Sequence, residues 1–189
     1  MAFNAVQLCS RALIGLGARA IAGFDEGSAE AEVSRHVYGP ARDALLSAHP
    51  WRFATAQVSL PRLVTPPRAD YDHAFQLPAD FLRALSAGTD SRGRGLAYRI
   101  VAGTLQADSD ALTLTYIFRP DESGFPPFFD QALTARLAAE FCLPLTESSS
   151  RAELLFKRAD EEFRRAKAID SQQGEPGRIE DFTLTEARR

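Results

Sequence analysis

The sequence predicts an α+β fold: a bundle of about four helices, an inserted small antiparallel β-sheet and an extended C-terminal tail. Apolar residues recur at helical steps of three and four over residues 1–50 and 124–170, and alternate over residues 51–120. A polar stretch broken by glycine and proline closes the chain. We therefore expect one folding unit over residues 1–170 and a flexible or partner-docking tail over 171–189.

The composition is that of an ordinary globular protein. Hydrophobic residues make up 45% and charged residues 25% of 189 residues, enough for one proper core. The net charge of −3 argues against electrostatic binding of nucleic acid over the whole protein surface. No apolar run approaches the roughly 18 residues that span a bilayer, so we expect no membrane contact. Cys9 and Cys142 lie on predicted apolar helix faces, which indicates buried free thiols.

The first predicted helix covers residues 3–16. Its apolar face consists of Val6, Cys9, Leu13 and Leu16. Gly15 and Gly17 loosely match a dinucleotide-binding fingerprint, but that motif must open a helix, whereas here it closes one. We expect these glycines to supply positive φ at the helix C-terminus.

A second helical stretch begins after Ser28, which is a favourable N-cap. Its apolar positions repeat every four residues, at Val33, Val37, Ala41 and Leu45. Pro40 interrupts the pattern, because an interior proline removes a helical hydrogen bond. The sequence therefore predicts a kink or break near Tyr38 and two helical pieces.

The second piece ends in a motif that we interpret as a structural corner. Pro50 stops the helix and makes His49 the last helical or first non-helical residue. We expect His49 to cap the last helical carbonyls or to form a hydrogen bond next to the turn, rather than to act in catalysis or ligand binding. Two rings follow, two positions apart, and they face the same side of an extended segment. The predicted corner consists of Arg42, Asp43, His49, Pro50, Trp51 and Phe53.

The middle of the chain has the pattern of short strands. The predicted strands are Phe53–Leu60, Ala74–Leu77, Phe81–Ala87, Tyr98–Val101, Thr104–Ala107 and Leu112–Phe118. Ala102-Gly103 fits the turn of a hairpin. The glycine- and arginine-rich stretch Thr89–Gly95 is typical of an exposed flexible tip.

Two more helices follow the strands. Pro126-Pro127 suits a first helical turn, and Pro144 predicts that this helix ends at Leu143. Ser150 and Glu153 have the spacing of a capping box that opens the last helix. In the tail, three apolar side chains are candidate contacts with a partner: Ile179, Phe182 and Leu184.

Residue patterns predict no catalytic residue, no metal site and no cofactor. The three histidines lie in different predicted contexts, and the sequence has neither a nucleophile elbow nor a phosphate-binding loop with lysine. Asp70, Asp72 and His73 form the one small polar group that resembles acid–base machinery. Aspartate is common in turns for its backbone hydrogen bonds alone, so this group is weak support for hydrolysis.

The corner belongs to a longer stretch, Tyr38 to Ala54, that reads YGPARDALLSAHPWRFA. This stretch resembles the tail tubular protein A, or head-to-tail adaptor, family of short-tailed bacteriophages. Supporting segments are Cys9–Leu13, Phe75–Phe81 and Leu143–Thr146. The resemblance extends from Leu8 to about Ala168, and the tail after Ser171 has no matching motif.

The resemblance implies a structural virion protein rather than an enzyme. Such proteins form a ring, usually dodecameric, that lies beneath the portal and joins it to the tail nozzle. A helical bundle contacts the portal, a β-rich part faces the next tail component, and DNA passes through the lumen without specific binding. The expected location is the virion tail, after assembly in the bacterial cytoplasm. The alternatives are a tail-associated cell-wall or polysaccharide hydrolase and a chaperone-like or regulatory binding module.

Overall fold

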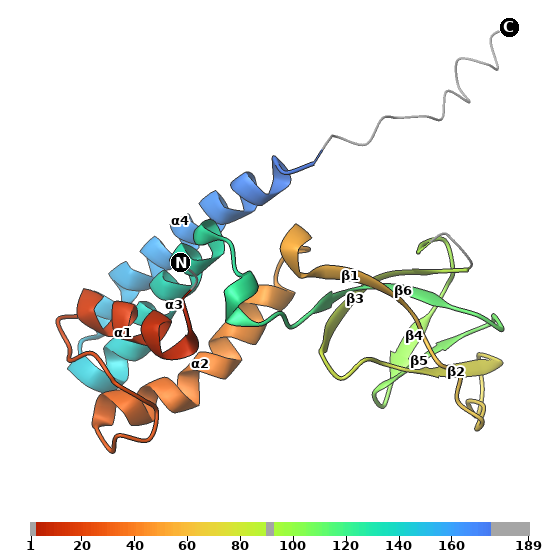
Figure 1. The fold of residues 1–189 in the computed structure, drawn as a ribbon, viewed down its shortest axis with the longest axis horizontal. Coiled ribbons are helices and arrows are strands. Elements are labelled where there is room, and N and C mark those ends of the chain that lie inside the picture. The colour runs from red at the N-terminus through yellow and green to blue at the C-terminus, as the bar shows by residue number, and fades with distance from the viewer. Residues whose placement is uncertain (1–2, 90–92, 175–189) are drawn as a thin grey trace, which may run out of the picture.

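The computed structural model describes residues 3–89 and 93–174 and has the predicted α+β fold (Figure 1). The helices are α1 (Ala5–Gly15), α2 (Ala29–Ser47), α3 (Pro127–Thr146) and α4 (Ser149–Ser171). The strands are β1 (Thr55–Ser59), β2 (His73–Gln76), β3 (Phe81–Gly88), β4 (Arg99–Val101), β5 (Thr104–Ala107) and β6 (Thr113–Phe118). Two 3₁₀ turns, η1 (Arg52–Ala54) and η2 (Glu122–Gly124), connect the helices to the strands.

The helices and the strands occupy opposite ends of an elongated molecule (Figure 1). Helix α3 lies at the centre of the helical part, where it packs against α1, α2 and α4. The chain leaves the helices through η1 and returns from β6 through η2. The two connections run side by side, so they form the junction between the two parts (Figure 1).

The strands form two three-stranded antiparallel sheets instead of the single small sheet expected from the sequence. Their strand orders are β1-β6-β3 and β2-β5-β4. A separate apolar cluster, which includes Phe75, Leu105 and Leu114, fills the β part. The predicted hairpin is confirmed: Val101 pairs with Thr104 across a turn in which Ala102 and Gly103 both have positive φ.

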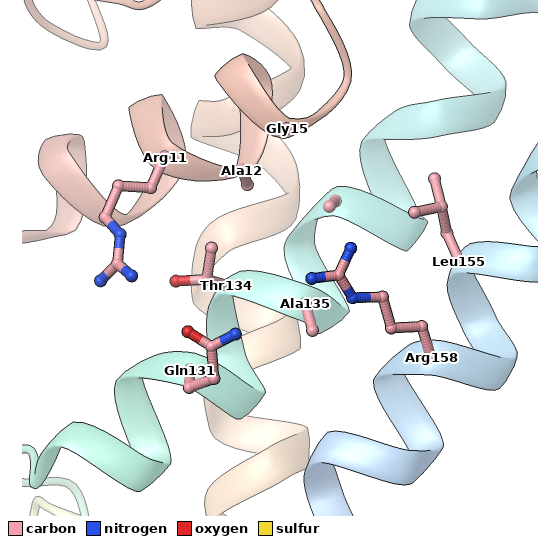
Figure 2. A pocket seen from close by; sticks show the side chains of 9 residues that line it. Arg11, Ala12, Gly15, Gln131, Thr134, Ala135, Leu155 and Arg158 are labelled. Atoms are coloured by element: carbon pink, nitrogen blue, oxygen red, sulfur yellow. The ribbon is translucent and has the colours of Figure 1, made fainter.

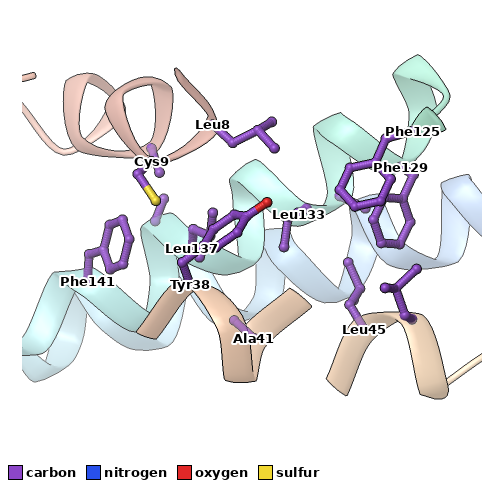
Figure 3. Packing of buried hydrophobic residues seen from close by; sticks show 14 of the residues in the cluster. Leu8, Cys9, Tyr38, Ala41, Leu45, Phe125, Phe129, Leu133, Leu137 and Phe141 are labelled. Carbon is purple, nitrogen blue, oxygen red and sulfur yellow. The ribbon is translucent and has the colours of Figure 1, made fainter. Parts of the chain in front are cut away.

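The main core lies among the helices (Figure 3). Side chains from α1, α2 and α3 interdigitate there, among them Leu8, Cys9, Tyr38, Leu45, Phe129, Leu133, Leu137 and Phe141. Cys9 and Cys142 are both buried and free, as predicted. Burial raises the pKa of the Cys9 thiol to about 12, so this cysteine is a packing residue and not a reactive nucleophile.

Two proline predictions are wrong. Helix α2 continues from Ala29 to Ser47 with Pro40 inside it, where we expected two pieces. Helix α3 continues past Pro144 and ends after Thr146, where Glu147 adopts a left-handed φ of 53°. A proline removes only one amide donor, and burial of the surrounding apolar faces in the shared core outweighs that loss.

The helix termini follow local chemistry. Ser28 caps α2 as predicted. Of the two glycines expected to have positive φ, Gly17 does, at 75° just after α1, whereas Gly15 is the last helical residue and does not. Asn4 and Gln7 form a capping box at the start of α1. The box predicted at Ser150 is wrong, because Ser148 is the residue that caps α4 by accepting from the Arg151 amide. No helix in residues 3–89 and 93–174 is both long and apolar enough to cross a membrane.

The predicted exposed tip is partly wrong. Residues 90–92 lie outside the described residues, but Gly93 is buried against β1 and β6. Its carbonyl oxygen accepts hydrogen bonds from the Ser86 hydroxyl at 2.6 Å and from the Thr115 hydroxyl at 3.0 Å. Glycine is required because a Cβ atom at this position would lie 2.5 Å from the Thr115 oxygen.

Candidate functional site

The corner is the most densely organised feature of the chain. Trp51 is fully buried between the end of α2 and η1. Its ring contacts five other rings at centroid distances from 4.7 to 6.3 Å, which belong to His49, Phe53, Phe128, Phe129 and Phe163. These partners come from the corner itself, from α3 and from α4, so Trp51 holds the ends of three helices together.

Trp51 performs the capping role that the sequence suggested for His49. The indole Nε1–H of Trp51 donates to the Leu45 carbonyl oxygen at 3.0 Å, deep in the protein. This bond satisfies one of the carbonyl groups that a helix C-terminus leaves unpaired. The prediction that His49 bonds the helix carbonyls is therefore not met. The segment is also a 3₁₀ turn rather than a strand, yet the Trp51 and Phe53 rings still meet at 5.9 Å.

Asp170, near the end of α4, also contacts the corner. Its side chain is 1% exposed, and its carboxylate oxygens accept from the Arg52 amide at 3.2 and 3.3 Å. His49 Nε2 lies 3.6 Å from the same carboxylate, too far for a hydrogen bond. Burial lowers the pKa of His49 below its usual value despite the nearby carboxylate, so the imidazole is neutral at pH 7. Sequence reasoning missed Asp170, because its partners are more than a hundred residues away.

A polar cluster joins α2 to the strand part. The Arg119 guanidinium, just after β6, donates to both Asp43 oxygens, with its shortest bond at 2.7 Å. Arg42 donates to Asp43 at 2.9 Å and to Glu122 at 3.3 Å, and the Tyr38 hydroxyl donates to Glu122 at 2.9 Å. We call these five residues the latch.

The surroundings of Asp43 and Tyr38 in the latch shift the pKa values of both groups. Burial alone would raise the pKa of Asp43, but the hydrogen bonds from Arg119 and Arg42 outweigh burial and lower it. Burial and the Glu122 carboxylate both raise the pKa of Tyr38, so its hydroxyl stays protonated. Arg42 and Asp43 were predicted as corner residues, whereas no local pattern pointed to Arg119 or Glu122. The latch has the properties of a structural connection, since both Asp43 oxygens and one Glu122 oxygen accept from donors within it.

The group Asp70, Asp72 and His73 does not converge on a common point. Asp70 accepts from Arg99 at 2.7 Å, whereas His73 lies 3.3 Å from Asp110, which also accepts from Arg62 at 2.7 Å. Asp72 and His73 do line one open cleft of about 450 Å³ beside β2. The carboxylates of Asp70 and Asp110 thus each accept from a guanidinium, and the Asp108 carboxylate accepts from the Asp72 amide at 2.8 Å, as expected for turn aspartates.

A small pocket opens among α1, α3 and α4 (Figure 2). Its volume is about 170 Å³, and its polar lining includes Arg11, Arg158, Gln131 and Thr134. Figure 2 shows the two guanidinium groups on either side of Thr134 and Gln131. Within residues 3–89 and 93–174, the buried Thr134 hydroxyl has no hydrogen-bond partner. Such a donor-rich lining can take a small oxyanion but contains no nucleophile or base.

The same described residues contain no group of three histidine, cysteine, aspartate or glutamate side chains that could hold a metal ion. No side chain named above is arranged as a cofactor ligand either. The corner and the latch consist of ring contacts, hydrogen bonds and ion pairs that link the helices, the 3₁₀ turns and the end of β6.

Exposed apolar side chains lie at both extremities of the molecule. At the helical end, the last turns of α1 and α3 and the first turn of α4 carry Ile14, Leu143 and Leu154, which are 62%, 54% and 66% exposed. A hydrogen bond from Arg151 to the Leu16 carbonyl, at 2.9 Å, joins α4 to α1 at this end. We call these three residues the helical-end patch.

At the opposite end, Ile100 and Val101 are 40% and 41% exposed on β4. Strand β4 is an edge of its sheet, because it pairs only with β5. An exposed apolar edge strand is a surface to which another chain can attach. Both the helical part and the strand part thus expose apolar side chains that a partner can cover.

Comparison with known proteins does not assign a family. No protein-family model matches the chain, and no curated protein matches it significantly.

Proposed function

We propose that this protein is a structural subunit of a bacteriophage tail, which forms the ring-shaped head-to-tail adaptor between the portal and the tail nozzle. The observation that supports this most is the presence of separate apolar surfaces at opposite ends of the molecule, one helical and one stranded. A subunit that bridges two different partners needs two such surfaces. The resemblance of the Tyr38–Ala54 stretch to adaptor proteins also supports this proposal.

The corner and the latch support this proposal in a second way. An adaptor must keep its two ends in a defined relative position while DNA passes through the ring. The Asp43–Arg119 pair is a half-buried contact between α2 and the end of β6, and such contacts restrict relative motion. Trp51 and Asp170 hold η1, through which the chain enters the strands, against the helices. Side-by-side packing of subunits through unlike surfaces closes into a ring when the rotation per subunit divides a full turn.

The proposed partners follow from this arrangement. The helical-end patch would contact the portal, and β4 would contact the nozzle. Ile179, Phe182 and Leu184, which lie outside the described residues, remain candidate contacts with the portal or a neighbouring subunit. The proposed location is the virion tail, and DNA would cross the lumen without specific binding. The proposed role requires no catalytic residue.

The experiment is native mass spectrometry with negative-stain imaging of the full chain, alone and mixed with the portal protein of the same genome. We expect rings of many copies, alone or stacked on the portal. Leu154→Glu should weaken portal binding, whereas the matched control Val101→Glu, on β4, should leave it unchanged. A persistent monomer that ignores the portal would contradict the proposal. Hydrolysis of cell-wall glycan that is lost in Asp72→Asn would instead support a tail-associated hydrolase.

A further inference from the structure

A groove between the beginning of α3 and the end of α4 has no described occupant. Pro127, Phe128 and Gln131 line it from α3, and Glu162, Arg165 and Ile169 line it from α4. We call it the terminal groove. Its volume is about 410 Å³, in the range of clefts that bind ligands.

The terminal groove is apolar in its centre and charged at its rim. Ile169 is 39% exposed there, beside the half-buried Phe128, whose ring packs at 6.3 Å from both Trp51 and Phe53. Exposed apolar side chains over a rigid aromatic floor are typical of a docking surface. The Arg165 side chain is 72% exposed, and its 3.4 Å bond to Glu162 leaves most of its donors free for an acidic partner.

The chain itself supplies a segment with the matching chemistry. Residues 175–189 follow directly after the end of α4, and they contain Ile179, Phe182 and Leu184. Glu180 and Asp181 lie between the first two of these apolar residues, so the segment offers acidic groups beside its apolar ones. An apolar and acidic segment is complementary to an apolar groove with a free guanidinium at its rim.

The geometry allows this segment to reach the terminal groove. The α4 side of the groove, from Ile169 back to Glu162, is about 10 Å long. A helical segment over residues 179–184 would cover about 9 Å and would place Ile179, Phe182 and Thr183 on one face. Pro176-Gly177 has the composition of a tight turn and precedes that segment by one residue, which favours a reversal of direction after α4.

We propose that the terminal groove is the docking site of the chain's own C-terminal segment, with Ile179 and Phe182 as apolar anchors and Glu180 or Asp181 paired with Arg165. The segment is covalently attached a few residues from the groove, so its effective concentration there is in the millimolar range. A free partner or a second copy at micromolar concentration competes poorly against such a tether. This inference goes beyond the adaptor function and does not depend on it.

Docking in the groove also defines a bound state from which a partner can displace the segment. A C-terminal segment held in its own groove keeps its apolar residues away from other subunits until a partner displaces it. The groove adjoins Phe128 and, through it, the corner, so displacement would expose a second apolar surface at the junction between the helices and the strands.

The test is a disulfide cross-link in the full chain carrying Gln131→Cys and Thr183→Cys. Cys9 and Cys142 are buried, so mild oxidation addresses the two introduced thiols. We expect a rapid cross-link within one chain, seen as a faster-migrating monomer, because a disulfide forms only when the Cα atoms approach to about 6 Å. The control pair Ile14→Cys and Thr183→Cys, at the helical end, should give no such species.

A second measurement uses the chain without introduced cysteines. Hydrogen exchange of the amides in residues 179–184 should be at least tenfold slower than in Ile169→Ser, which removes an exposed groove side chain while leaving the core intact. Disulfide-linked dimers alone would overturn the proposal and assign the groove to another copy's segment. The absence of both the cross-link and the protection would also overturn the proposal. Ring formation is scored separately by native mass spectrometry, so loss of either result leaves the other interpretable.

Discussion

Truncation of Trp51 to alanine is the most direct test of the corner. Removal of a fully buried large aromatic side chain costs about 3 to 5 kcal/mol of unfolding free energy. The structure places this site at the upper end of that range. Trp51 is 0% exposed, it contacts five rings, and its loss leaves the buried Leu45 carbonyl oxygen without its donor. An unpaired buried acceptor alone costs about 1 to 3 kcal/mol.

Trp51→Phe separates the two contributions. It keeps an aromatic ring in the cluster but removes the indole N–H, so we expect a loss of about 2 kcal/mol. Leu154→Ala, at a side chain that is 66% exposed, is the control and should stay within about 0.5 kcal/mol of the parent. Urea unfolding followed by far-ultraviolet circular dichroism measures all three, because it does not depend on the chain's single tryptophan. If Trp51→Ala unfolds at the same urea concentration as the parent, the corner does not anchor the fold.

Three further predictions concern stability. Gly93→Ala should destabilise by about 1 to 3 kcal/mol, because the added Cβ meets the Thr115 oxygen; the urea midpoint measures this loss. Asp170→Ala should cost about 1 to 3 kcal/mol by leaving the Arg52 amide unpaired, whereas the exposed Asp160→Ala should be neutral. Burial raises the pKa of Asp130 from 3.8 to about 6, so the folded state binds the proton more tightly than the unfolded one. Stability should therefore fall as pH rises from about 4 to about 6, by roughly 3 kcal/mol, and Asp130→Asn should abolish this slope in denaturation curves taken at several pH values.

Local features of this fold could be read from the sequence. The β4–β5 hairpin was predicted because Ala102-Gly103 carries its turn preference in two adjacent residues. Ser28 and Gly17 were placed correctly at helix ends for the same reason, since caps act within one turn.

Features that depend on distant residues could not be read in this way. Helix α2 passes through Pro40 because its apolar face is buried against α3, and the local rule for proline contains no such contact. Asp170 is ordinary in sequence, being one charged residue near the end of a charged helix, and its role exists only once α4 lies beside η1. The same holds for Arg119, whose partner Asp43 comes from a helix far earlier in the chain.

The distribution of polar hydrogen-bond partners explains how the molecule can be rigid at the junction while its two ends remain able to bind other chains. At the junction, the strong donors and acceptors of Arg42, Asp43, Arg119 and Asp170 are paired within the chain. Groups that are already paired offer little to a partner, since binding would have to break bonds worth about as much as those gained. The helical-end patch and β4 instead expose apolar surface, from which a partner gains roughly 25 cal/mol for each Å² that it removes from water. Association at the two extremities therefore gains apolar burial that the already paired polar groups of the latch do not offer.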